Sequence, residues 1–221
     1  MSRRRRIPLF PLPGVVLLPE TTLPLHVFEP RYREMLKDAL EGEGVLGIQL
    51  LVPGGVPDPA GRPEIFPVGC AGKVVEHEPL PDGRSNILLR GLFRYRIEGE
   101  VSSDKPYRVA EVTPLSVEPL PDRPSAPAAG RRLRLVADVG QLADAVGRPQ
   151  AKELPDDLSE EGLVNEILTR LGLDAEDGYR LLTMDRLEDR YAWAEELVVS
   201  MRRRLDLLAP FRSGDADPRW N

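Results

Sequence analysis

The chain has 221 residues, 41% of them hydrophobic and 30% charged, and a formal net charge of −6. This composition is typical of a globular protein with a core of its own. The negative charge argues against nucleic acid or an anionic membrane as the main partner, because phosphate recognition needs a concentrated positive surface.

Short apolar stretches interrupted by proline follow a basic run at Arg3–Arg6, which we expect to be a solvated tail. Proline cannot donate a hydrogen bond to a neighbouring strand, so these stretches predict short, bent strands of the kind that a small barrel needs. Their longest uninterrupted apolar run is Val15–Leu18. A secretory signal needs roughly 7–15 apolar residues and a membrane-spanning helix about 20. We therefore expect a cytoplasmic protein without a membrane segment.

A helix is predicted directly after the second apolar stretch. Pro30 suits the first turn of a helix, where its missing N–H costs nothing. Apolar residues then recur at steps of three and four, which predicts one apolar helix face. This face is formed by Tyr32, Met35, Leu36, Ala39 and Leu40.

The clearest of the later strands is Asn86–Glu98, where apolar side chains alternate on one face. Arg90, Arg94 and Arg96 share the other face, which we interpret as polar and outward-facing. Gly91 lies in the apolar register and predicts a bulge or a sharp bend. The other predicted strands and connections are strands at Val45–Val52, Val68–Glu78 and Tyr107–Pro114, a loop at Pro53–Pro63 and a turn at Pro81–Gly83.

The C-terminal part has helical periodicity and begins after Glu118–Gly130, which contains four prolines and predicts a stiff linker. The last helix is predicted to be the longest, with an apolar stripe from Leu187 to Leu208. The helix signals are a periodic segment at Arg131–Val146, a capping box at Asp157 and Glu160, and a second box at Asp185 and Glu188.

Three segments resemble the Lon substrate-binding domain, the N-terminal module of the ATP-dependent Lon proteases that is also found as a free-standing protein. They are Pro11–Met35, the run RGLFRYRIEG followed by YRVAEVTPL, and Leu181–Asp185. The resemblance implies the free-standing form, without ATPase or peptidase domains. It also implies a PUA-like, mixed or antiparallel β-barrel with one inserted helix, followed by a C-terminal helical bundle with one long helix.

We therefore predict an α+β protein of four parts. They are a PUA-like barrel domain at residues 1–118, a proline-rich linker at 119–130, a helical bundle domain at 131–211 and a tail at 212–221.

The sequence contains no recognisable catalytic, cofactor-binding or metal-binding motif. A phosphate-binding loop needs a Gly-Lys pair followed by Ser or Thr, but the only such pair, at residues 72–73, is followed by Val74. Apart from carboxylates, the possible metal ligands are His26, His77 and Cys70, too few to form a cluster. The Gly-x-Ser-x-Gly pattern of hydrolases is absent. We predict that the protein is not an enzyme and holds no cofactor and no metal.

The corner between the second apolar stretch and the helix supplies most of the candidate peptide-binding residues. In a structural interpretation, Glu29 pairs with Arg33 or accepts hydrogen bonds from the start of the helix, and so fixes the corner. In a functional interpretation, Tyr32 and the arginines border a groove for peptide, with the Pro53–Pro67 loop as its lip. The candidate residues are Phe28, Glu29, Arg31, Tyr32, Arg33 and Phe66.

We predict a non-catalytic protein-binding or peptide-binding module that resembles the substrate-recognition domain of Lon proteases and binds unfolded or partner polypeptide. An apolar groove or an exposed sheet edge would receive that polypeptide. The alternative is a PUA-like RNA-binding protein, which depends on analogy of fold. Its only local support is the arginine face of Arg90, Arg94 and Arg96.

Overall fold

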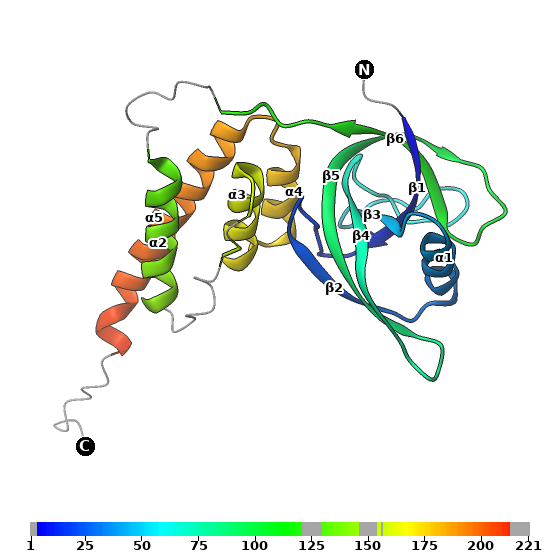
Figure 1. The fold of residues 1–221 in the computed structure, drawn as a ribbon, viewed down its shortest axis with the longest axis horizontal. Helices are drawn as coiled ribbons and strands as arrows, with labels where there is room; N and C mark the ends of the chain where they lie inside the picture. The colour runs from blue at the N-terminus through cyan, green and yellow to red at the C-terminus, as the bar shows by residue number, and fades with distance from the viewer. Residues whose placement is uncertain (1–3, 121–129, 146–153, 156, 213–221) are drawn as a thin grey trace. The chain divides into compact units, whose positions relative to one another are not determined.

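A computed structural model of the protein describes residues 4–120, 130–145, 154–155 and 157–212. Strands occupy the first half and helices most of the second (Figure 1). The α+β class predicted from the sequence is confirmed. In chain order the elements are β1 (Arg5–Leu12), β2 (Thr22–Val27), α1 (Pro30–Glu41), β3 (Val45–Leu50), β4 (Val68–Pro79), β5 (Ser85–Val101), β6 (Arg108–Leu115), α2 (Arg131–Ala145), α3 (Glu160–Arg170), α4 (Ala175–Thr183) and α5 (Leu187–Arg212).

The chain divides into two compact units. The first, which we call the strand unit, combines Met1–Pro119 with Asp157–Leu187, so that α3 and α4 group with the strands. The second combines Leu120–Asp156 with Glu188–Asn221. The sequence predicted that all helices after the linker form one bundle domain at 131–211. This division into domains stays a prediction. Most of the expected linker and tail lie outside the described residues.

A mixed six-stranded sheet forms most of the strand unit. Strands β1 and β3 pair in parallel, and the pairs β1–β6, β3–β4, β4–β5, β5–β6 and β2–β5 are antiparallel. Because β6 pairs with both β1 and β5, the five pairings among β1, β3, β4, β5 and β6 form a closed circuit. Strand β2 pairs with the first half of β5, and β6 pairs with its second half.

The change of partner along β5 falls at Gly91. Leu92 has no partner in β4, because Gly91 and Phe93 face consecutive residues of that strand, so the predicted bulge is confirmed. A Cβ atom at Gly91 would overlap the backbone carbonyl of Leu18 in the β1–β2 connection. The Gly91 N–H donates to the carbonyl of Thr21 at 2.9 Å. Only glycine therefore lets the β1–β2 connection lie against β5 at this point.

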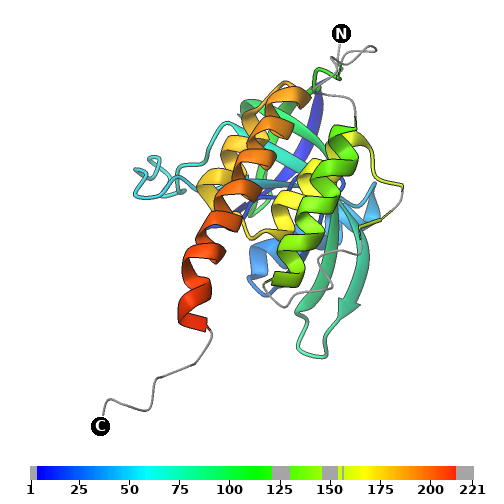
Figure 2. The ribbon, with the colours of Figure 1, turned by 90° about the vertical axis from the view of Figure 1, so that its left-hand side faces the viewer.

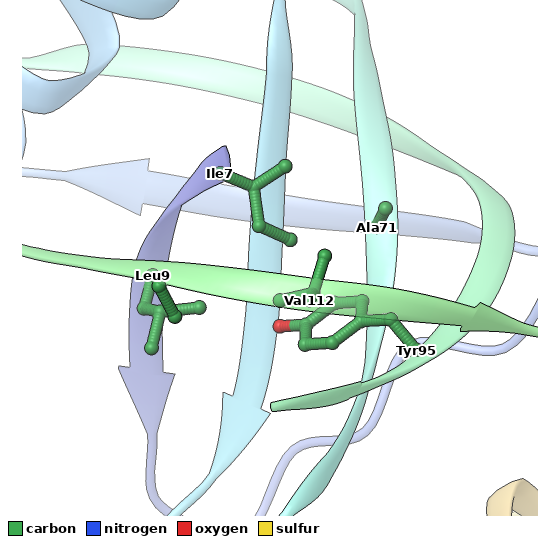
Figure 3. Packing of buried hydrophobic residues seen from close by; sticks show 6 residues of the cluster. Ile7, Leu9, Ala71, Tyr95 and Val112 are labelled. Atoms are coloured by element: carbon green, nitrogen blue, oxygen red, sulfur yellow. The ribbon is translucent and has the colours of Figure 1, made fainter. Parts of the chain in front are cut away.

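The core of the sheet lies between β1, β4, β5 and β6 (Figure 3). Its one phenol, Tyr95, donates a hydrogen bond of 2.8 Å to Oε1 of Gln49, which is also buried. The amide of Gln49 donates in turn to the carbonyls of Phe66 and Val68. Burial raises the pKa of Tyr95 well above its usual value, so this phenol stays protonated. The buried cluster consists of Ile7, Leu9, Ala71, Tyr95, Ala110 and Val112.

Arg94 is fully buried, with 1% of its surface exposed, so the predicted outward-facing arginine row is wrong at this position. Its Nη1 donates to the carbonyl of Leu182 at 2.7 Å and lies 3.2 Å from Oδ1 of Asp185. Its Nη2 donates to the carbonyl of Ser116 at 2.9 Å. The end of α4 and the segment after it cover this part of β5, whereas the other two arginines of the face are exposed.

The β1–β2 connection contacts the start of α3. The carboxylate of Glu20 accepts hydrogen bonds from the backbone N–H of Ser159, at 3.1 Å, and from its hydroxyl. The Ser159 hydroxyl caps the helix by accepting from the N–H of Gly162 at 3.0 Å. The helix thus begins two residues later than the capping box predicted at Asp157.

In the second unit, α2 and α5 run side by side in the same direction (Figure 1, Figure 2). Arg131, at the start of α2, pairs with Glu195 at 2.7 Å and lies over the ring of Tyr191. Further along, Arg202 donates to Gln141. The predicted apolar stripe of α5 is buried from Leu187 to Val198.

Candidate functional site

The start of α1 is held by Glu29, Arg31 and Tyr32. Tyr32 is buried, with its ring centroid 4.4 Å from that of Phe10, and burial raises the pKa of its phenol. The Arg31 guanidinium lies over the Tyr32 ring at 4.5 Å and pairs with the carboxylate of Glu29 at 2.8 Å. The backbone carbonyl of Glu29 accepts from the N–H groups of Tyr32 and Arg33. The expected ion pair between Glu29 and Arg33 is replaced by the pair between Glu29 and Arg31.

Phe28, in contrast, points into solvent, with 57% of its surface exposed. Its ring stacks on His26 with 6.1 Å between centroids. His26 Nδ1 lies 2.8 Å from Oδ1 of Asn86, and His26 Nε2 lies 3.4 Å from Nη1 of Arg84. Through His26, the exposed ring of Phe28 is therefore connected to Arg84 in the turn between β4 and β5.

A groove separates α1 from the turn between β4 and β5, and we call it the α1–hairpin groove. Its volume is about 330 Å³. Leu36, Leu40 and Pro79 give it apolar walls, and Leu40 is 40% exposed although it belongs to the apolar helix face. The full lining is Arg33, Leu36, Lys37, Leu40, Glu41, His77, Pro79, Gly83, Arg84 and Ser85.

Gly83 shapes one end of this groove. Its φ of 80° lies in the left-handed region that favours glycine, and a Cβ atom there would overlap the guanidinium of Arg33. The turn therefore lets Arg33 lie directly against the backbone. Arg84, next in the chain, pairs with Asp82 at 2.6 Å.

Arg33 and Lys37 differ from Arg84, because neither forms an ion pair with any residue that the structure describes. Both are exposed on α1. Among the residues that the structure describes, Glu41 is the one carboxylate that lines the groove. The α1–hairpin groove thus combines apolar walls with two cations that form no ion pair within the described part of the chain.

A second cavity, of about 230 Å³, is also bordered by α1 but has a different charge arrangement. Arg31 and Tyr32 contribute to its lining. Its other cations are neutralised within the protein: Arg62 pairs with Asp58 at 2.6 Å, Lys105 with Asp38 at 2.6 Å, and Arg108 with Glu100. The hydrogen bond from Lys105 is the main reason that the pKa of Asp38 is lowered.

Phe66 lies apart from the other candidate residues. Its ring packs against that of Tyr179 on α4, with 4.2 Å between the centroids. The six candidates therefore lie in four places: Arg33 lines the α1–hairpin groove, Phe28 stacks on His26, Glu29, Arg31 and Tyr32 form the corner, and Phe66 packs against α4. As binding residues all six stay predictions.

Sequence reasoning missed Lys37, Leu40 and Arg84 as lining residues. The turn that carries Arg84 was predicted, but nothing in the sequence indicates that it lies beside α1. Cys70 is buried, and burial raises the pKa of its thiol, which fits a packing role.

Two kinds of feature are absent from the described part of the chain. No three histidine, cysteine or carboxylate side chains gather there in an arrangement that could hold a metal ion. Among the same residues, no helix is long and apolar enough to cross a membrane.

Comparison with known proteins points in one direction. Residues 6–200 match the family model described as the ATP-dependent protease La (LON) substrate-binding domain. The Lon protease of Cytophaga hutchinsonii is 25% identical over 201 residues, 87% of this chain and 24% of that protein. The Lon protease of Trichlorobacter lovleyi is 25% identical over 210 residues, 94% of this chain and 25% of that protein. The chain thus spans about a quarter of the length of these curated relatives.

Solved structures agree. The crystal structure of a Lon N-terminal domain protein from Xanthomonas campestris has a TM-score of 0.58 and 25% identity, covering 88% of this chain and 98% of that one. The N-terminal domain of the Mycobacterium avium complex Lon protease has a TM-score of 0.61 at 15% identity, with the same coverages, and this likeness concerns the fold.

Proposed function

Because the chain belongs to the ATP-dependent protease La (LON) substrate-binding domain family, we propose that it is a non-catalytic module that binds unfolded polypeptide. The polypeptide would bind at Phe28 and in the α1–hairpin groove. Two observations carry this proposal: the exposed ring of Phe28 before α1, and an open groove whose wall includes Leu40, which is 40% exposed. Exposed large apolar side chains can mark a contact surface.

The residues that line the same groove suit binding better than catalysis. The α1–hairpin groove contains one carboxylate, one histidine and no cysteine among the described residues, and its apolar walls suit side-chain recognition.

We propose that the protein acts in the cytoplasm, in a process related to proteolysis. In fold terms, we propose a PUA-like barrel for the strands, supported by their closed circuit of pairings, and a helical bundle for the C-terminal helices.

The RNA-binding alternative loses its local support. It depended on three arginines on one outer face of β5, but Arg94 is buried and hydrogen-bonded to protein carbonyls. A buried guanidinium in these contacts is not available to phosphate.

The test is binding of the full chain to a reduced and alkylated protein that cannot refold, measured by fluorescence anisotropy. Phe28→Ser and Leu40→Ser should each weaken binding by about tenfold, because burying a large apolar side chain contributes about 1.5–3 kcal/mol. Leu92→Ser is the matched control, since Leu92 is 43% exposed elsewhere on β5. Absence of binding would refute the function, and equal losses in all three variants would refute the site.

A further inference from the structure

The α1–hairpin groove differs in charge from the protein that carries it. The chain has a formal net charge of −6. The groove is lined by three cations, Arg33, Lys37 and Arg84, and by a single carboxylate, Glu41. Arg84 is partly neutralised by Asp82, but Arg33 and Lys37 have no ion-pair partner among the described residues.

Unpartnered cations distinguish this groove from the second cavity beside α1. There, Arg62, Lys105 and Arg108 each pair with a carboxylate of the protein. An incoming anion would have to displace these partners. In the α1–hairpin groove, an incoming carboxylate meets Arg33 and Lys37 without breaking any ion pair that the described residues form.

The walls between these cations are apolar, so an anion alone would not fill the groove. Leu36, Leu40 and Pro79 suit a large apolar side chain. In an extended peptide, neighbouring residues are about 3.3 Å apart along the chain, so a carboxylate one or two residues from that side chain reaches the cations.

We infer that the α1–hairpin groove selects unfolded segments in which a large apolar side chain is flanked by aspartate or glutamate. Segments in which lysine or arginine flank the same side chain are disfavoured, because they place like charges beside Arg33 and Lys37. This selectivity rests on the proposed function, since it concerns which polypeptide the same groove prefers.

The experiment uses three labelled peptides that share a central Leu-Phe pair and differ only in flanking residues: Asp, Ser or Lys. The acidic peptide should bind the full chain about tenfold more tightly than the basic one, because its carboxylates form ion pairs with Arg33 and Lys37 whereas the basic peptide places like charges there. The difference should shrink as NaCl rises from about 0.05 to about 0.5 M, because salt screens exposed charges.

A charge-reversed variant and a matched control locate the effect. Arg33→Glu/Lys37→Glu should abolish or invert the preference for the acidic peptide. Lys73→Glu/Arg90→Glu changes the net charge equally at two exposed cations of β4 and β5, and it should keep the preference within about twofold. Circular dichroism of both variants checks that the fold is retained.

The outcomes separate this inference from the proposed function. Equal binding of acidic and basic peptides, or a preference that survives Arg33→Glu/Lys37→Glu, would overturn the charge selectivity and leave polypeptide binding intact. If none of the peptides and no unfolded protein binds, the proposed function fails, and the selectivity fails with it.

Discussion

Arg94 on β5 and Arg33 on α1 belong to the same strand unit and have opposite surroundings. Arg94 is 1% exposed and donates hydrogen bonds to the carbonyls of Leu182 and Ser116. Arg33 is exposed on the wall of a groove and pairs with no described carboxylate. The position of an arginine on the polar face of a helix or strand therefore does not reveal its role. A buried and bonded guanidinium joins parts of the fold, whereas an exposed and unpartnered one is available to a ligand.

The largest effect on stability is expected when the buried side chain of Arg94 is removed. Arg94→Ala leaves the buried carbonyl of Leu182 and the partly buried carbonyl of Ser116 without their donor and opens a cavity, so the free energy of unfolding should fall by about 3–5 kcal/mol. Urea denaturation of the full chain measures it. Arg96→Ala, at an exposed position two residues along the same strand, should cost less than about 0.5 kcal/mol. Similar costs for the two variants would contradict a structural role for Arg94.

An effect of intermediate size on stability is expected at Asp38. Its carboxylate pairs with Lys105 and accepts a hydrogen bond from the phenol of Tyr107. Lys105 and then Tyr107 lower the pKa of Asp38 in the folded state. Its contribution to stability is therefore present above the unfolded pKa of about 3.9 and is lost as the pH falls through the lowered folded value. Asp38→Asn should lower the urea midpoint at neutral pH.

The pH dependence of that difference provides the check. Between Asp38→Asn and the parent chain, the gap in urea midpoint should narrow as the pH falls below about 3.9. Glu43→Gln, which removes an exposed carboxylate that has no ion pair among the described residues, should show no such gap. A gap that stays constant down to the acid limit would exclude the ion pair as its cause.

The smallest effect on stability is expected in the α1–hairpin groove itself. Arg33→Gln/Lys37→Gln removes no ion pair among the residues that the structure describes, and it keeps residues of good helix propensity, so the urea midpoint should not change measurably. The same variant should lose preference for the acidic peptide. A clear loss of stability would show that these cations hold α1 in place, which would remove the contrast with Arg94.

The sequence allowed the local features of the fold to be predicted, because they depend on periodicity and on backbone chemistry. The buried face of α1 at Tyr32 and Met35 follows from spacing, and the bulge at Gly91 from glycine in a strand. Alternation along β5 predicted Arg94 in an outward-facing polar row, but the pattern cannot show that the end of α4, far along the chain, covers this position. Helix α4 itself was not predicted.

The groove was beyond prediction for the same reason. Arg33 and Gly83 meet only because α1 and the turn between β4 and β5 lie side by side, and no sequence pattern links them. The corner was partly predicted: it forms a local network, but through Arg31 and not Arg33. Phe66 was grouped with the corner as part of a loop, and the structure places it against Tyr179.

The strand unit is discontinuous, since Asp157–Leu187 belongs to it although α2 intervenes in the chain. During synthesis the strands therefore leave the ribosome before the helical cover of β5 exists. Until Leu182 has emerged, Arg94 has no carbonyl of α4 to bind, and the nascent sheet carries a charged side chain that only later becomes part of its interior. Completion of this unit thus waits until Asp157–Leu187 has been translated.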